Sequence, residues 1–219
     1  MLGTLGIFVI VLIVVYIVVY QEKPDIVDER TTKFASQLDK LWKIQNAAVR
    51  SKKLLQAEKA LLMILRVDER NAAAYNRLGV IFAKQRNYDD AIECFEIAQS
   101  LDPTASSFHN VGLVYMEVGN LERATMALQQ AVELEPDLAF RHISYAQVLE
   151  KINDKKTMIA ELEKAVELEP TPQVLKILAD AYDEDDKATL ATSLRDRAKK
   201  LDSKTGNPKT IRQPRKVVM

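Results

Sequence analysis

The first apolar stretch of the chain, Leu2–Tyr20, contains no charged residue, and fourteen of its nineteen residues are Leu, Ile, Val or Phe. As a helix it would span about 28 Å, close to the hydrocarbon thickness of a bilayer. A cleaved signal peptide would need a basic start, a shorter apolar run and a small-residue cleavage site. No Lys or Arg precedes the run, and Gln21, Glu22 and Lys23 follow it. The pattern therefore predicts a retained, single-pass transmembrane helix over residues 2–20.

A helical pattern resumes after Pro24. Phe34, Leu38 and Leu41 follow one another at three- to four-residue intervals, which is typical of a helix with one apolar face. We interpret residues 21–37 as a juxtamembrane linker and the start of this helix. Basic residues follow the predicted span and none precedes it, and the positive-inside rule places such flanks in the cytoplasm. We therefore expect a cell-membrane protein whose soluble part lies on the cytoplasmic side.

The rest of the chain repeats itself. The triplets at residues 101–103, 134–136 and 168–170 read Leu-Asp-Pro or Leu-Glu-Pro, and fainter copies begin at residues 67 and 201. Successive copies are 34, 33, 34 and 33 residues apart. A small residue recurs at the same offset in four successive copies, as Gly79, Gly112, Ala146 and Ala179. In the first two of these copies, the helical stretch that follows has a small residue of its own, Ala91 or Ala124. A period of this length predicts stacked copies of one supersecondary unit.

These residue types suit pairs of antiparallel helices. A Gly or Ala where two helices cross lets their backbones approach closely, and larger apolar residues one turn away fill the space on either side. Pro103, Pro136 and Pro170 each follow a predicted second helix, which proline cannot continue. One such hairpin cannot bury its apolar face alone, so neighbouring hairpins stack. The predicted fold class is therefore all-α.

This set of landmarks resembles the tetratricopeptide repeat family. The resemblance implies an α-solenoid of stacked helical hairpins over residues 38–203, in addition to the predicted transmembrane helix. Three repeats are clear, at residues 71–104, 105–138 and 139–171, and degenerate hairpins at 38–70 and 172–203 flank them. The outer hairpins depart from the family pattern, with Gln45 where a small residue belongs and Arg195 where an apolar one belongs. Terminal repeats commonly differ because one of their faces meets water.

The resemblance also implies a concave groove, lined by the first helices of successive repeats, that receives peptides or partner helices. Matching positions give ten groove residues: Asn76, Val80, Ala83, Asn110, Leu113, Met116, Phe140, Ile143, Gln147 and Lys151. An exposed apolar stripe rimmed by polar groups is a binding surface in general. The alternative is that a neighbouring helix covers the larger apolar members of this set.

One known type of groove is not expected here. Relatives that hold the acidic tails of heat-shock chaperones use a carboxylate clamp of Lys, Arg and Asn. Asn110 matches the central asparagine of that clamp, but Phe140 and Ser144 occupy the slots for Lys and Arg. A bound carboxylate would therefore have no bidentate partner.

Charge is balanced overall and uneven along the chain. There are 31 basic and 31 acidic residues, so no overall basic field favours nucleic acid, and we expect no specific nucleic-acid recognition. Residues 204–219 contain no acid and five cations: Lys204, Lys209, Arg212, Arg215 and Lys216. With few apolar residues, this segment is predicted to be a disordered basic tail. It either only aids solubility or adds a weak, salt-sensitive contact with anionic lipid or RNA.

No pattern in the sequence points to catalysis, a metal site or a cofactor. Cys94 is the only cysteine, and His109 and His142 fall on different repeats with no carboxylate or cysteine at ligand spacing. The acidic run 183–186 falls at a predicted turn, where solvated carboxylates are expected. Neither a glycine-rich phosphate loop nor a nucleophile motif is present. We therefore expect a protein that is not an enzyme.

The function expected from these features is that of a membrane-anchored scaffold or adaptor, which binds a protein or peptide in the groove. In arrangement the chain resembles single-span tetratricopeptide proteins of bacterial inner membranes that serve envelope assembly. It lacks the paired-cysteine metal domain that one such type carries. A translocation-associated receptor or holdase for unfolded chains is the main alternative, and a regulator of an enzyme is another. An adaptor would bind one or two partners, whereas a holdase would bind many.

Overall fold

The computed structural model describes Tyr16 and residues 29–204. The predicted transmembrane helix over residues 2–20 lies outside the described residues apart from Tyr16, and so do residues 21–28 of the linker and the basic tail from residue 205. Among the helices that are described, none is both long enough and apolar enough to cross a membrane.

The described helices divide into two compact units, one ending at Val67 and the other beginning at Asp68. Unit 1 contains α2 (Glu29–Arg50) and α3 (Leu54–Val67), which pack against each other. Leu41 and Ala48 of α2 are buried, as are Leu61 and Ile64 of α3. Gln45, the departure from the family pattern on α2, is buried as well, with 3% of its surface exposed. The first predicted hairpin therefore forms a unit with a small core of its own.

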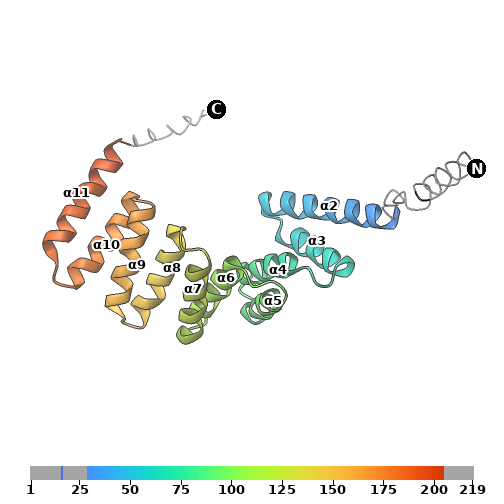
Figure 1. Ribbon diagram of the computed structural model, residues 1–219, viewed down its shortest axis with the longest axis horizontal. Helices are drawn as coiled ribbons and strands as arrows, with labels where there is room; N and C mark the ends of the chain where they lie inside the picture. Colours follow the sequence, from blue (N-terminus) through green and yellow to red (C-terminus); the bar gives the residue numbers. More distant parts are fainter. Residues whose placement is uncertain (1–15, 17–28, 205–219) are drawn as a thin grey trace, which may run out of the picture. The chain divides into compact units, whose positions relative to one another are not determined.

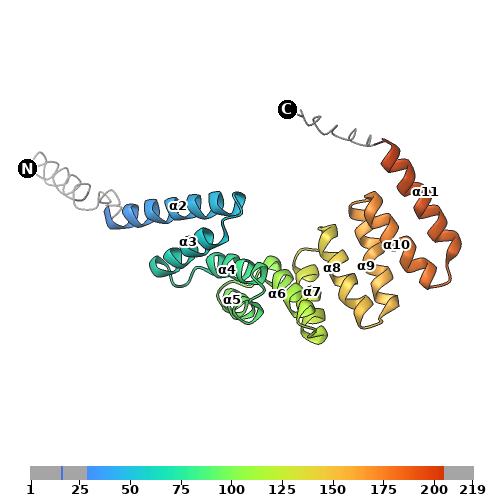
Figure 2. The same ribbon diagram turned by 180° about the vertical axis from the view of Figure 1, so that it is seen from behind.

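Unit 2 consists of four helical hairpins. Its helices are α4 (Ala72–Lys84), α5 (Tyr88–Leu101), α6 (Ala105–Glu117), α7 (Leu121–Leu134), α8 (Ala139–Lys151), α9 (Lys155–Leu168), α10 (Pro172–Glu184) and α11 (Ala188–Lys204). Each odd-numbered helix packs on its hairpin partner, and α5, α7 and α9 also pack on the first helix of the next hairpin. Both views show the hairpins following one another in chain order (Figures 1 and 2). Over the described residues the fold is an all-α solenoid without strands.

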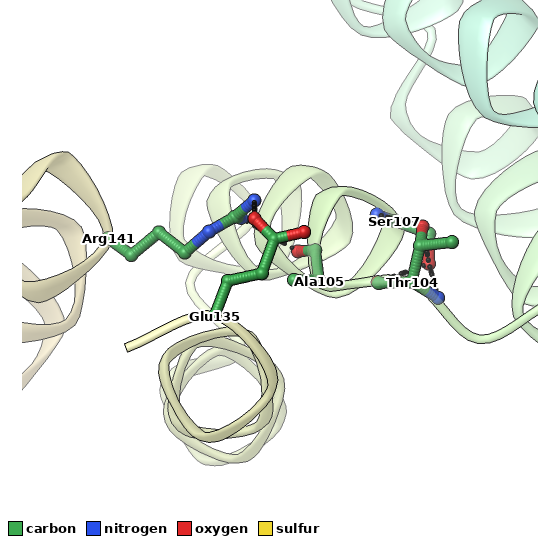
Figure 3. A network of polar contacts seen from close by, with 5 residues as sticks. All are labelled: Thr104, Ala105, Ser107, Glu135 and Arg141. Atoms are coloured by element: carbon green, nitrogen blue, oxygen red, sulfur yellow. Dashed lines mark hydrogen bonds and ion pairs between the residues drawn. The ribbon is translucent and has the colours of Figure 1, made fainter. Parts of the chain in front are cut away.

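Side chains at the hairpin starts explain where most first helices begin. Asn71, Thr104 and Thr171 precede α4, α6 and α10, and each accepts a hydrogen bond from a backbone N–H in the first turn. Such a cap satisfies one of the donors that a helix start leaves without an intrahelical partner. Thr104 and Ser107 form a reciprocal pair of these bonds, seen at the right of Figure 3.

The turn inside each hairpin has the same backbone geometry. One residue in each turn has a positive φ, between 56° and 80°: Lys52, Arg86, Gly119, Asn153 and Asp186. The next residue donates its backbone N–H to the carbonyl oxygen five positions earlier, at 2.8 to 2.9 Å in all five turns. This bond from the residue after a left-handed residue is characteristic of the Schellman helix end. The turn therefore recurs in unit 1 and in every hairpin of unit 2.

Small residues lie where the two helices of a hairpin approach most closely. A Cβ added to Gly79 would lie 2.8 Å from the Phe95 ring, and one added to Gly112 would lie 2.7 Å from Leu128 Cγ. Neither distance is tolerated without a shift of the neighbour. Ala146 and Ala179 occupy the same place in the next two hairpins and are buried, as are Ala91 and Ala124 on the second helices. The core of unit 2 therefore lies between the two helices of each hairpin and continues from one hairpin to the next.

The prolines and Arg195 lie at the edges of this core. Pro103, Pro136 and Pro170 each stand two residues beyond the last residue of α5, α7 and α9, and all three are exposed. Arg195, on the last helix, is only partly exposed and makes ion pairs of 2.6 Å with Asp180 and Asp183 of α10. Its charge is therefore matched within the last hairpin, where other repeats have an apolar residue.

Candidate functional site

The ten predicted groove residues lie on α4, α6 and α8, the first helices of three successive hairpins. None of the ten is fully buried: seven are half-buried, and the exposed ones are Phe140, Gln147 and Lys151. Phe140 keeps 49% of its surface exposed, so no neighbouring helix covers it. The three helices therefore present these side chains on an accessible surface.

Two hollows lie along this surface. The α4–α6 hollow has a volume of about 320 Å³ and brings together four predicted residues, Val80, Ala83, Asn110 and Leu113. Tyr88 and Val114 complete its apolar wall, and Lys84 and Glu117 lie at the ends of α4 and α6. An apolar floor with a few polar groups at its edge is the usual composition of a ligand pocket.

Asn76 and Asn110 occupy the same position in successive repeats and touch each other. Asn110 Nδ2 donates a hydrogen bond to Asn76 Oδ1 over 3.1 Å. An amide side chain has two donor hydrogens and an acceptor oxygen, so this one bond leaves Asn110 Oδ1 as an acceptor and Asn76 Nδ2 as a donor. The pair can therefore offer both kinds of hydrogen bond at the edge of the α4–α6 hollow.

The α8–α10 hollow has a volume of about 280 Å³ and contains two predicted residues, Ile143 and Gln147. The hollow has eight further lining residues that the sequence did not predict as groove residues: Ala146, Glu150, Met158, Leu162, Ile177, Asp180, Ala181 and Glu184. The α10 residues were missed because the family pattern marks the last hairpin as a cap. Asn76, Met116, Phe140 and Lys151 line neither hollow.

A cluster around Arg141 ties the middle hairpins together near Phe140. The guanidinium of Arg141 donates to the carbonyl oxygen of Ala105 at 2.9 Å and pairs with Glu135, as Figure 3 shows. It also lies 5.0 Å from the centre of the Phe140 ring, and the His109 ring meets Phe140 edge-on at 5.2 Å. Phe140 is thus held from two sides while half of its surface faces solvent.

His109 is poorly suited to act as a base because its environment disfavours the charged form. Burial, and then the nearby Arg141 guanidinium, lower the pKa of His109 from 6.5 to about 4. Its Nδ1 is buried and has no hydrogen-bond partner among the described residues. The ring therefore packs as a neutral group against Phe140.

His142 has a different, fully paired environment. Its Nδ1 lies 2.6 Å from Glu161 Oε2 on α9, and its Nε2 lies 2.7 Å from the carbonyl oxygen of Pro136. Lys164 donates to the other oxygen of Glu161 at 3.2 Å. Both His142 and Glu161 are buried, so the pair joins α8 to α9 and to the preceding loop.

The remaining candidates for chemistry are structural groups. Burial, followed by the charges of Glu93 and Asp90, raises the pKa of the Cys94 thiol to about 11, which disfavours the reactive thiolate. In the acidic run, Asp183 pairs with Arg195 and Asp185 pairs with Lys187. Within residues 29–204, no group of His, Cys, Asp and Glu is arranged to hold a metal ion.

Comparison with known protein families identifies three of the four hairpins of unit 2. Tetratricopeptide repeat models match residues 72–104, 105–138 and 142–172. These segments are tetratricopeptide repeats. The matches include every predicted groove residue except Phe140, and all the residues that line the α4–α6 hollow. No curated protein sequence matches the chain.

Solved tetratricopeptide structures share the fold. A crystal structure of MamA is 20% identical, covers 74% of this chain and 96% of its own, and gives a TM-score of 0.67. MamA from residue 41 to its end, from Desulfovibrio magneticus RS-1, is 17% identical with a TM-score of 0.70, covering 78% of this chain and 98% of its own. YrrB, described as a TPR protein with an unusual peptide-binding site, is 19% identical and gives a TM-score of 0.61. The match covers 73% of this chain and 83% of YrrB. At these identities the likeness establishes the repeat fold.

Proposed function

We propose that the chain is a protein-binding scaffold whose groove receives a peptide or a partner helix at the α4–α6 hollow. The observation that carries this proposal is the bonded pair of Asn76 and Asn110 at the edge of that hollow. The backbone of a bound peptide offers both N–H donors and carbonyl acceptors, and the pair has one of each to give. The apolar floor beside it suits the peptide's side chains. YrrB, a structural neighbour with this fold, has a peptide-binding site, which supports the proposal.

A selection from random displayed peptides on the full chain, held in detergent, would test this function. We expect the selected peptides to lose about tenfold in affinity when Asn76→Ala and Asn110→Ala are combined. One hydrogen bond contributes roughly 0.5–1.5 kcal/mol, and 1.4 kcal/mol corresponds to tenfold in affinity. Fluorescence anisotropy with the selected peptides measures the change.

The matched control replaces two other amides, Gln129→Ala and Gln130→Ala. Both lie exposed on α7, where each donates to Glu133 and neither lines a hollow. Their loss should leave peptide affinity unchanged. Equal affinity for the wild type and the double asparagine variant would contradict the proposal. Binding of peptides that share no sequence preference would instead support the holdase alternative.

The proposed role is binding without catalysis. Supporting this, the thiol of Cys94 and both described histidines occupy packed or paired positions rather than an open site. The proposal of binding without catalysis would be contradicted if the purified chain turned over a substrate and a groove substitution abolished that turnover.

We also propose that residues 2–20 anchor this scaffold in a membrane, with unit 2 on the cytoplasmic side, where it would assist the assembly of a membrane or envelope complex. The support is the uncharged apolar run and the basic residues that follow it. A reporter that is active only in the cytoplasm, fused after Met219, should then be active. Activity of a reporter that works only outside the membrane would contradict the proposed side.

A further inference from the structure

The α8–α10 hollow differs from the α4–α6 hollow in the charge of its rim. Apolar side chains from three helices form its floor, among them Ile143, Met158 and Ile177. Three carboxylates, those of Glu150, Asp180 and Glu184, also line it, and no Lys or Arg does. An apolar floor with an acidic rim is complementary to a segment that carries both cations and apolar side chains.

Nearby cations neutralise only part of the negative charge on the rim. Arg195 pairs with Asp180 at 2.6 Å, and Lys155 lies 3.9 Å from Glu184. Within the described residues, Glu150 has no ion-pair partner, and its side chain is exposed. The rim therefore keeps negative charge that a basic segment can neutralise.

The chain itself contains a segment of matching chemistry. The basic tail, residues 204–219, has five cations and no acid, and it includes the apolar residues Ile211, Val217 and Val218. The other hydrophilic stretch outside the described residues does not match, because residues 21–28 contain Glu22, Asp25 and Asp28 against Lys23 alone. Charge complementarity thus selects the basic tail.

The tail begins close enough to reach the hollow. Lys176 on α10 and Asp202 on α11 form an ion pair of 3.1 Å, so the end of α11 lies beside the first turns of α10. Asp180 and Glu184 follow Lys176 by four and eight residues, or about 6 and 12 Å along the helix. The five residue-to-residue steps from Lys204 to Lys209 can span up to about 17 Å. The remaining cations, from Lys209 onward, can therefore reach the rim.

We propose that the basic tail docks in the α8–α10 hollow of its own chain, with its cations on the acidic rim and an apolar side chain on the floor. The proposal rests on the proposed function, because it requires the repeats to accept an extended segment. A tethered segment has an effective concentration in the millimolar range, so an outside ligand must compete with it for this hollow.

Photo-crosslinking in the full chain tests the docking directly. A benzophenone amino acid replaces Ile211, and mass spectrometry locates the crosslinked residues after illumination in detergent. We expect crosslinks to α8, α9 or α10 of the same chain, which mixing of isotope-labelled and unlabelled copies distinguishes from crosslinks between copies. Raising the salt from about 0.01 M to about 1 M shortens the Debye length from about 30 Å to about 3 Å and should reduce their yield.

A charge reversal and its matched control define the site. Glu150→Lys should lower the crosslink yield at least fivefold, because it adds a cation where the tail brings its own. Glu167→Lys makes the same change at an exposed residue of α9 that does not line the hollow, and should leave the yield unchanged. Combining Glu150→Lys with the single reversal Arg212→Glu should restore part of the yield, because Asp180 and Glu184 still attract the remaining tail cations.

Several outcomes would overturn the docking. These are crosslinks only between copies, crosslinks only to lipid in anionic bilayer discs or to added RNA, and a yield that Glu150→Lys does not change. The two proposals fail separately. Loss of docking with intact peptide binding at Asn76 and Asn110 would remove only the tail proposal, and the reverse result would remove only the proposed function.

Discussion

Gly79 and Gly112 stand one repeat apart, and each faces a large buried side chain of its partner helix. The distances from an added Cβ to Phe95 and to Leu128 are below 3.0 Å, so even alanine would force these side chains to move. Gly119 is different, since nothing lies within 4 Å of an added Cβ and only its φ of +80° matters. At the residue scale, glycine is thus needed for space at two positions and for backbone conformation at a third.

The space requirement at Gly112 can be measured with a double-mutant cycle. Gly112→Ala should lower the free energy of unfolding by about 1–3 kcal/mol through overpacking against Leu128. Leu128→Ala alone should cost about 2–5 kcal/mol by leaving a cavity. In the double variant the new methyl group occupies part of that cavity, so the combined cost should be less than the sum. Urea unfolding followed by circular dichroism gives the three values, and strict additivity would refute the close contact.

His109 should make stability depend on pH. Its pKa is about 4 in the folded chain, below the ordinary value of 6.5 that a solvated histidine has when the chain is unfolded, so the unfolded chain binds the proton more readily. Its contribution is complete above about pH 6.5 and is lost as the pH falls from 6.5 toward 4. Because the ring is partly exposed, we expect a loss of roughly 1–2 kcal/mol rather than the full value for this shift.

The difference between the wild type and His109→Gln isolates this effect, because all other titrating groups are common to both. As the pH falls from about 7 to about 4, the wild type should lose roughly 1–2 kcal/mol of unfolding free energy relative to His109→Gln. A difference that stays constant over this range would show that His109 has an ordinary pKa in the folded chain.

At the residue scale, the sequence predicts structural roles that depend on the residue type alone. Gly79, Gly112 and the three prolines are predictable because their offsets repeat and their steric properties belong to the residue itself. The pairing of His142 with Glu161 is not, since the two residues are nineteen positions apart and meet only when α8 packs on α9. Nothing in the local pattern distinguishes Glu161 from the exposed acids near it.

Hairpins, rather than single helices, are the units that polar contacts hold together. Within the third hairpin of unit 2, His142 and Glu161 join α8 to α9. Between hairpins, Arg141 of α8 reaches the backbone of Ala105 at the start of α6, and Tyr115 of α6 donates to Glu96 of α5 at 2.9 Å. Because Arg141, His142, Glu161 and Tyr115 are buried, these contacts favour one register of stacking over others.

The contribution of the buried His142–Glu161 pair to the packing of α8 on α9 can be measured. Glu161→Gln should lower the free energy of unfolding by about 1–3 kcal/mol, because the neutral amide has one acceptor oxygen where the carboxylate contacts both His142 and Lys164. Glu167→Gln, an exposed change on the same helix, should stay within about 0.5 kcal/mol of the wild type. Thermal or urea unfolding of the two variants decides the matter, and equal stabilities would mean that Glu161 adds nothing to the joint between α8 and α9.

Element boundaries follow well from the sequence where side chains cap or stop a helix. For example, Thr104 caps the start of α6, and Pro170 lies two residues after the end of α9. The first helix is harder to delimit, because α2 begins at Glu29, inside the stretch 21–37 that we interpret as a linker and the start of this helix. Amphipathic spacing predicts that a helix exists but does not say how far an exposed helix extends beyond its partner.

For the whole molecule, the sequence predicts the solenoid better than it predicts the binding surface. The repeat period identifies which helices come first in each hairpin, and the resemblance to the family then implies the ten groove residues. It does not identify hollows, which form where side chains from three helices leave space. The acidic rim of the α8–α10 hollow is such a case, since Glu150 and Glu184 belong to different repeats and come together only through stacking.

The recurring hairpin turn has a consequence for how the repeats of this chain are counted. Five different residue types occupy its left-handed position, so the turn has no shared side chain for a sequence comparison to recognise. Family models match three copies, between residues 72 and 172, and the turns at Lys52 and Asp186 lie outside that range. The positive-φ residues keep the 33- to 34-residue interval of the sequence repeat. Over the described residues, backbone conformation therefore identifies five hairpins, two more than the family models match.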